Sequence, residues 1–152
     1  MDTAQLKEHL ISVFPDVTLE DQKEFPTLLV PAKKLHDVAV YLRKEEGLFM
    51  DFLFCMTGMD WGQDLGVVYH LRSTRHQHSV VLKVRTADRD TPVFPTVSDI
   101  WRTAEFQERE IFDLFGIRFE NHPDLRRIFL EESWRGYPLR KDYQDQVNLV
   151  EF

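Results

Sequence analysis

The stretch that decides the fold is LFMDFLFCM, at Leu48–Met56, the most apolar segment of the chain. Its length and composition predict a buried strand at the centre of a sheet. Two further runs rich in β-branched residues follow, VVYHL at Val67–Leu71 and SVVLKVR at Ser79–Arg85. Turn residues separate the three runs at 62–66 and at 73–76. The pattern therefore predicts an antiparallel meander.

Two helices and a short strand are predicted before this meander. Asp2 followed three residues later by Gln5 is a capping signal for a first helix, which Pro15 ends. Residues 25–30 read as a short strand, with Pro26 tolerated near its start and Pro31 directly after it. A second helix should end at Gly47. Its buried stripe is predicted to be Leu35, Val38, Ala39 and Leu42.

A third helix and a long irregular segment are predicted after the meander. Residues 88–95 read as a loop, and Thr96 or Ser98 can cap a helix that stops at Gly116. Helical and strand periodicity then disappear. We therefore expect an α+β fold, a mainly antiparallel sheet packed against three helices, with a globular domain at 1–116 and an extended C-terminal arm at 117–152.

Composition excludes several classes of protein. The chain has 152 residues, a net charge of −7 and a pI near 5.3, which argues against a dedicated nucleic-acid binder. A single cysteine, Cys55, excludes an internal disulfide and an all-cysteine cluster or zinc site, and we expect it in the core. No apolar run approaches the roughly 20 residues of a membrane span.

A carboxylate is predicted at the centre of the third helix's apolar face. Steps of 100° per residue place Glu108 among apolar side chains, where it needs a cationic or hydrogen-bonded partner or must take a proton. The arm offers Arg126, Arg127 and Arg140. We favour a buried tie that fixes the arm over a catalytic acid. The apolar side chains on this face are Val97, Trp101, Ala104, Ile111, Phe112 and Phe115.

The opposite face of this helix is a docking candidate. Phe106 lies there beside Glu110 and Asp113, so an aromatic ring stands among carboxylates where a free monomer would meet water. Arg109 lies at the flank and can reach Asp113 at i+4. In the arm, Trp134 is the best interface candidate because its segment has no periodic core pattern.

No self-sufficient active site is evident. His70, His76 and His78 invite a metal site, but no nearby carboxylate or cysteine completes a ligand set, so solvent-facing histidines are favoured. Asp60 follows the first strand and can cap a turn or pair with the arm. No phosphate loop, nucleophile elbow or HExxH pattern is present. The residues therefore predict no catalytic, cofactor-binding or metal-binding position in this chain.

Three blocks in order resemble one family. They are Glu108–Gly116 (EREIFDLFG), His122–Ile128 (HPDLRRI) and Pro138–Tyr143 (PLRKDY). With the segments at 94–101 and 57–61, they resemble the 30-kDa (C) subunit of proton-translocating NADH–quinone oxidoreductase, respiratory complex I. The resemblance covers most of the chain.

The resemblance implies a hydrophilic subunit of the peripheral arm that carries no flavin or cluster itself. FMN, iron–sulfur clusters and quinone are then bound by neighbouring subunits. The C-terminal arm packs on the domain and on the quinone-site (D) subunit, with two cluster-bearing subunits (B and I) nearby. Contact with the membrane comes only through the complex, on the cytoplasmic side of the bacterial inner membrane, and no nucleic acid is involved.

We expect the functional residues of this chain to make structural contacts within it and contacts with partner subunits. Glu108 ties the helix to arm arginines, and the remaining charges form ion pairs within the chain and with partners. The full set is Phe106, Glu108, Arg109, Glu110, Asp113, His122, Asp124, Arg126, Arg127, Arg140, Lys141 and Asp142. Two alternatives stay open: the equivalent subunit of a membrane-bound [NiFe]-hydrogenase or formate hydrogenlyase-type complex, and a stand-alone acid/base enzyme using Glu108.

Overall fold

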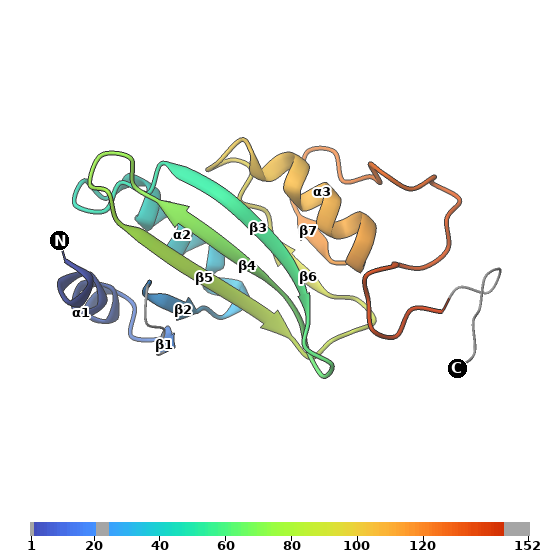
Figure 1. Ribbon diagram of the computed structural model, residues 1–152, viewed down its shortest axis with the longest axis horizontal. Coiled ribbons are helices and arrows are strands. Elements are labelled where there is room, and N and C mark those ends of the chain that lie inside the picture. The colour runs from blue at the N-terminus through green and yellow to red at the C-terminus, as the bar shows by residue number, and fades with distance from the viewer. Residues whose placement is uncertain (1, 21–24, 145–152) are drawn as a thin grey trace.

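The structure is a computed structural model that describes residues 2–20 and 25–144. A curved sheet lies at its centre, with α2 behind the sheet, α3 beside β3 and the arm leading away from α3 (Figure 1). The elements are α1 (Thr3–Val13), β1 (Thr18–Glu20), β2 (Thr27–Leu29), the 3₁₀ turn η1 (Ala32–Lys34), α2 (Leu35–Lys44), β3 (Phe52–Asp60), β4 (Leu65–Arg72), β5 (Ser79–Thr86), β6 (Val93–Pro95), α3 (Ala104–Phe115) and β7 (Arg118–Glu120).

The main sheet is mixed but mainly antiparallel. Its strand order is β1-β2-β5-β4-β3, with antiparallel pairs except for the parallel pair β2–β5. The predicted meander is β3, β4 and β5, so the α+β class is confirmed. The predicted central place of the first apolar run is wrong, because β3 is one of the two edge strands of this sheet. Two of its apolar side chains, Phe52 and Phe54, are each 46% exposed and do not lie in the core.

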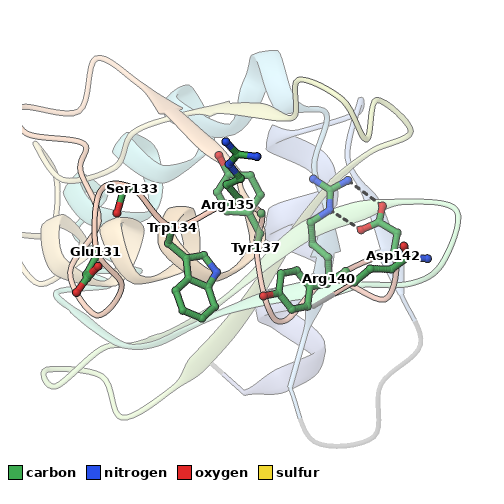
Figure 2. A pocket seen from close by; sticks show the side chains of 10 residues that line it. Glu131, Ser133, Trp134, Arg135, Tyr137, Arg140 and Asp142 are labelled. Atoms are coloured by element: carbon green, nitrogen blue, oxygen red, sulfur yellow. Dashed lines mark hydrogen bonds and ion pairs between the residues drawn. The ribbon is translucent and has the colours of Figure 1, made fainter. Parts of the chain in front are cut away.

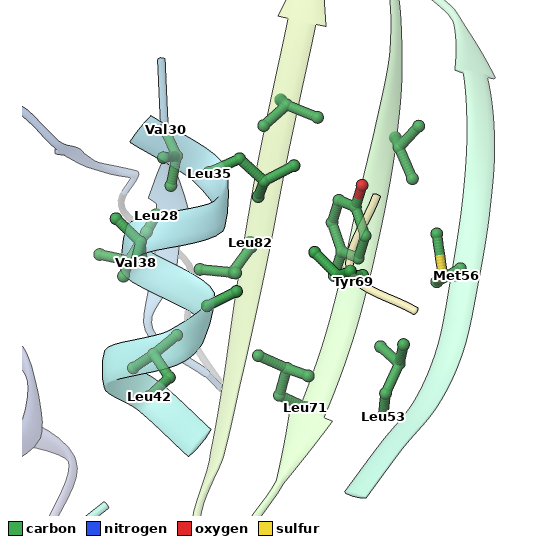
Figure 3. Close-up of a cluster of buried hydrophobic side chains, with 14 of the residues drawn as sticks. Leu28, Val30, Leu35, Val38, Leu42, Leu53, Met56, Tyr69, Leu71 and Leu82 are labelled. Atoms are coloured by element: carbon green, nitrogen blue, oxygen red, sulfur yellow. The ribbon is translucent and has the colours of Figure 1, made fainter. Parts of the chain in front are cut away.

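The main core lies between this sheet and α2. Val38 and Leu42 of α2 face Leu71 and Leu82 of the sheet, and all four are almost fully buried (Figure 3). Burying a leucine contributes about 2 kcal/mol relative to leaving it in water. The predicted stripe of α2 is therefore confirmed. The helix ends at Lys44 rather than near Gly47, because the capping residue Glu45 already has extended backbone angles.

Helix α3 covers part of the edge of β3. The side-chain oxygen of Gln107 accepts the Met56 N–H at 2.7 Å, and the Thr103 hydroxyl donates to the Leu53 carbonyl at 3.3 Å. At Gly58 the helix approaches so closely that an added Cβ would lie 2.6 Å from the ring of Phe115. An uncovered edge strand is a template for aggregation, and α3 provides cover here.

The ends of α3 agree with the sequence only in part. The helix stops at Gly116, as predicted, because this residue is left-handed with φ of 74°. The start at Thr96 or Ser98 is wrong. Residues 97–101 form turns, and the helix begins at Ala104. The expected core place of Cys55 is also wrong, since it is only partly buried beside a bulge in β3.

The first residues of the arm belong to the packed domain. Strand β7 pairs in parallel with β6, so the loop predicted at 88–95 contains a strand. Ile117 and Phe119 are buried in the core. From Asn121 to Gln144 the arm has no helix or strand. Within the described residues, no helix is both long enough and apolar enough to cross a bilayer.

Candidate functional site: the attachment of the arm to α3

Asp113 of α3 is the point around which the arm folds. Its Oδ2 accepts three successive backbone N–H groups, from Ile128 at 3.2 Å, Phe129 at 2.7 Å and Leu130 at 3.1 Å. Its Oδ1 lies 3.0 Å from Nη1 of Arg127. Burial opposes ionisation, but these donors outweigh it and hold the pKa of Asp113 below its ordinary value.

The predicted position of Asp113 on the outer face is therefore wrong. Its side chain has no exposed area, because the arm crosses the helix at this point. Periodicity within one helix reports which residues share a face. It does not report which segment, distant in sequence, will cover that face.

Arg109 holds the arm through carbonyl groups rather than through a carboxylate. Its Nε and Nη2 donate to the carbonyls of Arg126 and Arg127 at 3.2 and 3.3 Å. The predicted pairing of Arg109 with Asp113 is wrong, because Asp113 is already occupied. The Arg109 guanidinium also lies 5.9 Å from the centre of the exposed Phe106 ring.

Arg127 fixes the next loop of the arm. Besides Asp113, its guanidinium donates to the carbonyls of Trp134 at 3.3 Å and Gly136 at 2.9 Å. It also lies 4.8 Å from the centre of the Tyr137 ring. One partly buried cation thus joins α3 to two turns of the arm, which gives residues 127–137 a defined shape without regular secondary structure.

The last described part of the arm is attached at Asp60, at the end of β3. Both Asp60 oxygens accept from Arg89 at 2.8 Å, and the backbone N–H of Lys141 donates to Oδ2 at 2.8 Å. Asp60 also accepts from the Gly62 N–H at 2.9 Å, so it both caps the turn and holds the arm. Hydrogen bonding to Arg89 is the largest cause that lowers the pKa of Asp60 far below the ordinary value.

Arg140 and Asp142 complete this second attachment. The two side chains pair at 3.0 Å, and Arg140 donates from Nη2 to the Arg89 carbonyl at 2.7 Å. Asp142 lies 3.3 Å from the Arg89 guanidinium. Sequence reasoning missed Arg89, because no pattern in a loop indicates which distant carboxylate a cation will meet.

The predicted tie between Glu108 and the arm arginines is wrong. Glu108 accepts from the Thr96 hydroxyl and from the Val97 N–H, the latter at 3.0 Å. Glu108 points toward the segment that enters α3, and the arm crosses the helix one turn later. The three arginines pair elsewhere, Arg126 with Asp124, Arg127 with Asp113 and Arg140 with Asp142.

Two of the three histidines considered as metal ligands bond backbone groups instead. His76 and His78 contact the carbonyls of Glu46 at 2.6 Å and Leu48 at 2.9 Å, and so tie the β4–β5 hairpin to the segment before β3. No group of three metal-ligating side chains is found among the described residues.

The attached arm presents apolar side chains to solvent. Sequence reasoning found Phe106 and Trp134 but missed Ile128, Phe129 and Leu139, which lie in the irregular arm. Glu110 is exposed beside them on α3. We call the five apolar residues the exposed apolar set: Phe106 and Phe129, each 63% exposed, with Ile128, Trp134 and Leu139.

A cavity of about 600 Å³ opens within the arm. Trp134, Tyr137 and Tyr143 contribute aromatic walls, and the paired Arg140 and Asp142 lie at one side (Figure 2). Aromatic side chains around an open hollow are typical of protein interfaces. The fold and this site define a class: an α+β domain whose C-terminal arm is held by ion pairs and exposes apolar side chains to solvent.

Comparison with known proteins identifies the family. Residues 28–147 match the respiratory-chain NADH dehydrogenase, 30 Kd subunit, and the chain belongs to this family. The resemblance drawn from the three sequence blocks is thus confirmed.

Relatives agree with this assignment. The C subunit of NADH-quinone oxidoreductase from Moorella thermoacetica is 37% identical, with 92% of this chain and 94% of the relative covered. The C/D subunit of the same enzyme from Phocaeicola vulgatus is 54% identical over 78% of this chain. The chain covers only 23% of that longer C/D relative.

A solved structure shares the fold. A chain of the membrane-bound sulfane sulfur reductase, an archaeal respiratory membrane complex, superposes with a TM-score of 0.71. The match covers 97% of this chain and 88% of that chain, at 24% sequence identity. The similarity supports the fold, including the mixed sheet.

Proposed function

We propose that this chain is a structural subunit of an NADH–quinone oxidoreductase and that no reaction takes place on its own residues. The observation that carries the proposal is the folding of the arm around Asp113. Buried charges are costly unless paired, and pairing of this kind fixes geometry more than it adds stability. Here it fixes a loop that exposes Ile128 and Phe129 to solvent.

The partner that we propose for the exposed apolar set is the quinone-site (D) subunit, with the B and I subunits nearby. The C/D name of relatives supports it, because it indicates one polypeptide that carries both parts. In this proposal the complex passes electrons from NADH through FMN and iron–sulfur clusters to quinone, coupled to proton translocation. Those groups are bound by neighbouring subunits, and the complex holds this chain at the cytoplasmic side of the membrane.

A second candidate is the equivalent subunit of a respiratory complex with another electron donor, such as a membrane-bound [NiFe]-hydrogenase. The structural neighbour shows that this fold also occurs in another respiratory membrane complex, a sulfane sulfur reductase. Affinity capture from native membranes separates the two. We expect the flavin-bearing subunits of NADH oxidation to co-purify, whereas a hydrogenase subunit in their place would contradict the NADH assignment.

The docking surface is tested with a double substitution in the arm. We expect Phe129→Ser with Trp134→Ser to reduce recovery of the quinone-site subunit with the tagged chain by roughly tenfold or more, because aromatic anchors dominate binding energy. The matched control is Phe52→Ser with Phe54→Ser, which removes two exposed aromatics from β3. Undiminished recovery with the arm variant, at an unchanged melting temperature, would contradict the proposed surface.

A further inference from the structure

Glu108 is a buried ionisable residue that the attachment of the arm does not use. Its side chain has no exposed area, and its two oxygens accept from the Thr96 hydroxyl and the Val97 N–H. Hydrogen bonds satisfy these oxygens, but they supply no positive charge. A buried carboxylate without a cation carries a large desolvation cost.

The described residues provide no cation for Glu108. The basic group that approaches it is His122, whose Nε2 lies 3.9 Å from Glu108 Oε1. Backbone groups already engage both nitrogens of this ring. Nδ1 accepts the Asp124 N–H at 3.0 Å and therefore carries no proton, while Nε2 donates to the Glu105 carbonyl at 2.8 Å.

The other ionisable groups near Glu108 also disfavour its charge. Burial raises the pKa of Glu108 to about 7, the bonds from Thr96 and Val97 oppose this effect, and the carboxylate of Asp99 adds to it. Tyr69 of β4 is buried, and its hydroxyl has no hydrogen-bond partner among the described residues. Burial, and then Glu108, raise the pKa of Tyr69.

A chain of hydroxyl groups connects Glu108 to solvent. Thr96 Oγ1 lies 2.8 Å from Ser98 Oγ, and both residues line an open cavity of about 600 Å³. The wall of this cavity is acidic, and His36 at the rim pairs with one of its carboxylates at 2.8 Å. The acidic residues of the wall are Asp99, Glu105 and Glu120.

We propose that Glu108 is a proton-binding site, held as the neutral acid in the folded chain. The Glu108 hydroxyl then donates to Thr96, Thr96 donates to Ser98, and the other Glu108 oxygen still accepts from Val97. Protons enter and leave through the acidic cavity. Because α3 also carries Asp113, ionisation of Glu108 places an unpaired charge in the helix that holds the arm.

The test is a titration of the full chain labelled with ¹³C, in which carbon NMR follows every glutamate carboxyl group. We expect one glutamate with a midpoint near 7 and the others in their ordinary range. Glu108→Gln should remove that signal. Glu110→Gln, on the exposed face of the same helix, should leave it. Thr96→Val should raise the midpoint, because the Thr96 hydroxyl donates more strongly to the charged carboxylate than it accepts from the neutral acid.

Two results would overturn the proposal. One is a wild-type chain in which every glutamate titrates in the ordinary range. The other is a high-midpoint signal that persists unchanged in Glu108→Gln. If that variant does not fold, the Thr96→Val chain decides, since a signal that does not move there cannot belong to Glu108. These measurements require no partner subunit and are independent of the proposed docking.

Discussion

Glu108 and Asp113 are buried carboxylic acids on the same helix, α3, and their neighbours decide which of them is charged. Asp113 lies against the Arg127 guanidinium and three backbone N–H groups, so its charge is compensated. Glu108 is equally buried, but its donors are neutral. The pKa values of the two acids are therefore shifted in opposite directions, which gives the helix one fixed charge and one removable proton.

The first prediction at the residue scale concerns removal of the Asp113 charge. We expect Asp113→Asn to release the arm, because it leaves the Arg127 guanidinium without its counter-charge and weakens three backbone bonds. Breaking a buried pair in this way costs about 3 kcal/mol. Limited proteolysis between residues 121 and 144 measures the release. The control is Asp124→Asn, which removes the exposed pair with Arg126 and should leave the cleavage rate unchanged.

The pH dependence of stability should separate the two acids. The pKa of Glu108 is raised from 4.5 to about 7 on folding, so its stabilising effect is present below pH 4.5 and is lost as the pH rises through 7. The pKa values of Asp113 and Asp60 are lowered, so their contribution is present above about pH 4 and is lost in acid.

Denaturant unfolding at a series of pH values measures this dependence. Between about pH 5 and pH 7 we expect the free energy of unfolding of the wild type to fall by up to roughly 3 kcal/mol relative to Glu108→Gln. The difference between the two proteins cancels the other titrating groups. A difference that stays constant over this range would contradict a neutral Glu108.

At the scale of elements, local signals predict what local contacts determine. The cap of α1 by Asp2 and Gln5 and the end of α3 at Gly116 are predictable, because each depends on neighbours within four residues. Strands β4 and β5 are predictable from their long runs of β-branched residues. Strands β6 and β7 have three residues each and form by pairing between distant parts of the chain, so neither leaves a periodic signal.

The candidate site likewise has features that depend on local contacts and features that depend on distant parts of the chain. The inward position of Glu108 and the exposure of Phe106 follow from helical geometry, and the sequence predicts both. The partners of Glu108, the burial of Asp113 and the role of Arg89 depend on where an irregular arm crosses the domain. Because the arm has no helical or strand periodicity, its sequence does not indicate which carbonyl or carboxylate its side chains will contact.

At the scale of the whole molecule, the structure predicts where the chain can be shortened. The sequence predicts a globular domain that ends at residue 116, but Ile117 and Phe119 are 0% and 3% exposed and β7 completes a sheet with β6. Burying each such side chain contributes about 2 kcal/mol, against a total stability of about 5–15 kcal/mol for an ordinary domain.

We therefore expect a chain that ends at residue 116 to lose most of its stability and a chain that ends at residue 125 to keep it, because the second retains β7 and Leu125, which packs against the core. Thermal unfolding followed by circular dichroism compares the two. The longer fragment should fold and yet fail to recover the quinone-site subunit, since it lacks the loop around Asp113. Equal melting temperatures for the two fragments would show instead that β7 belongs to the arm and not to the domain.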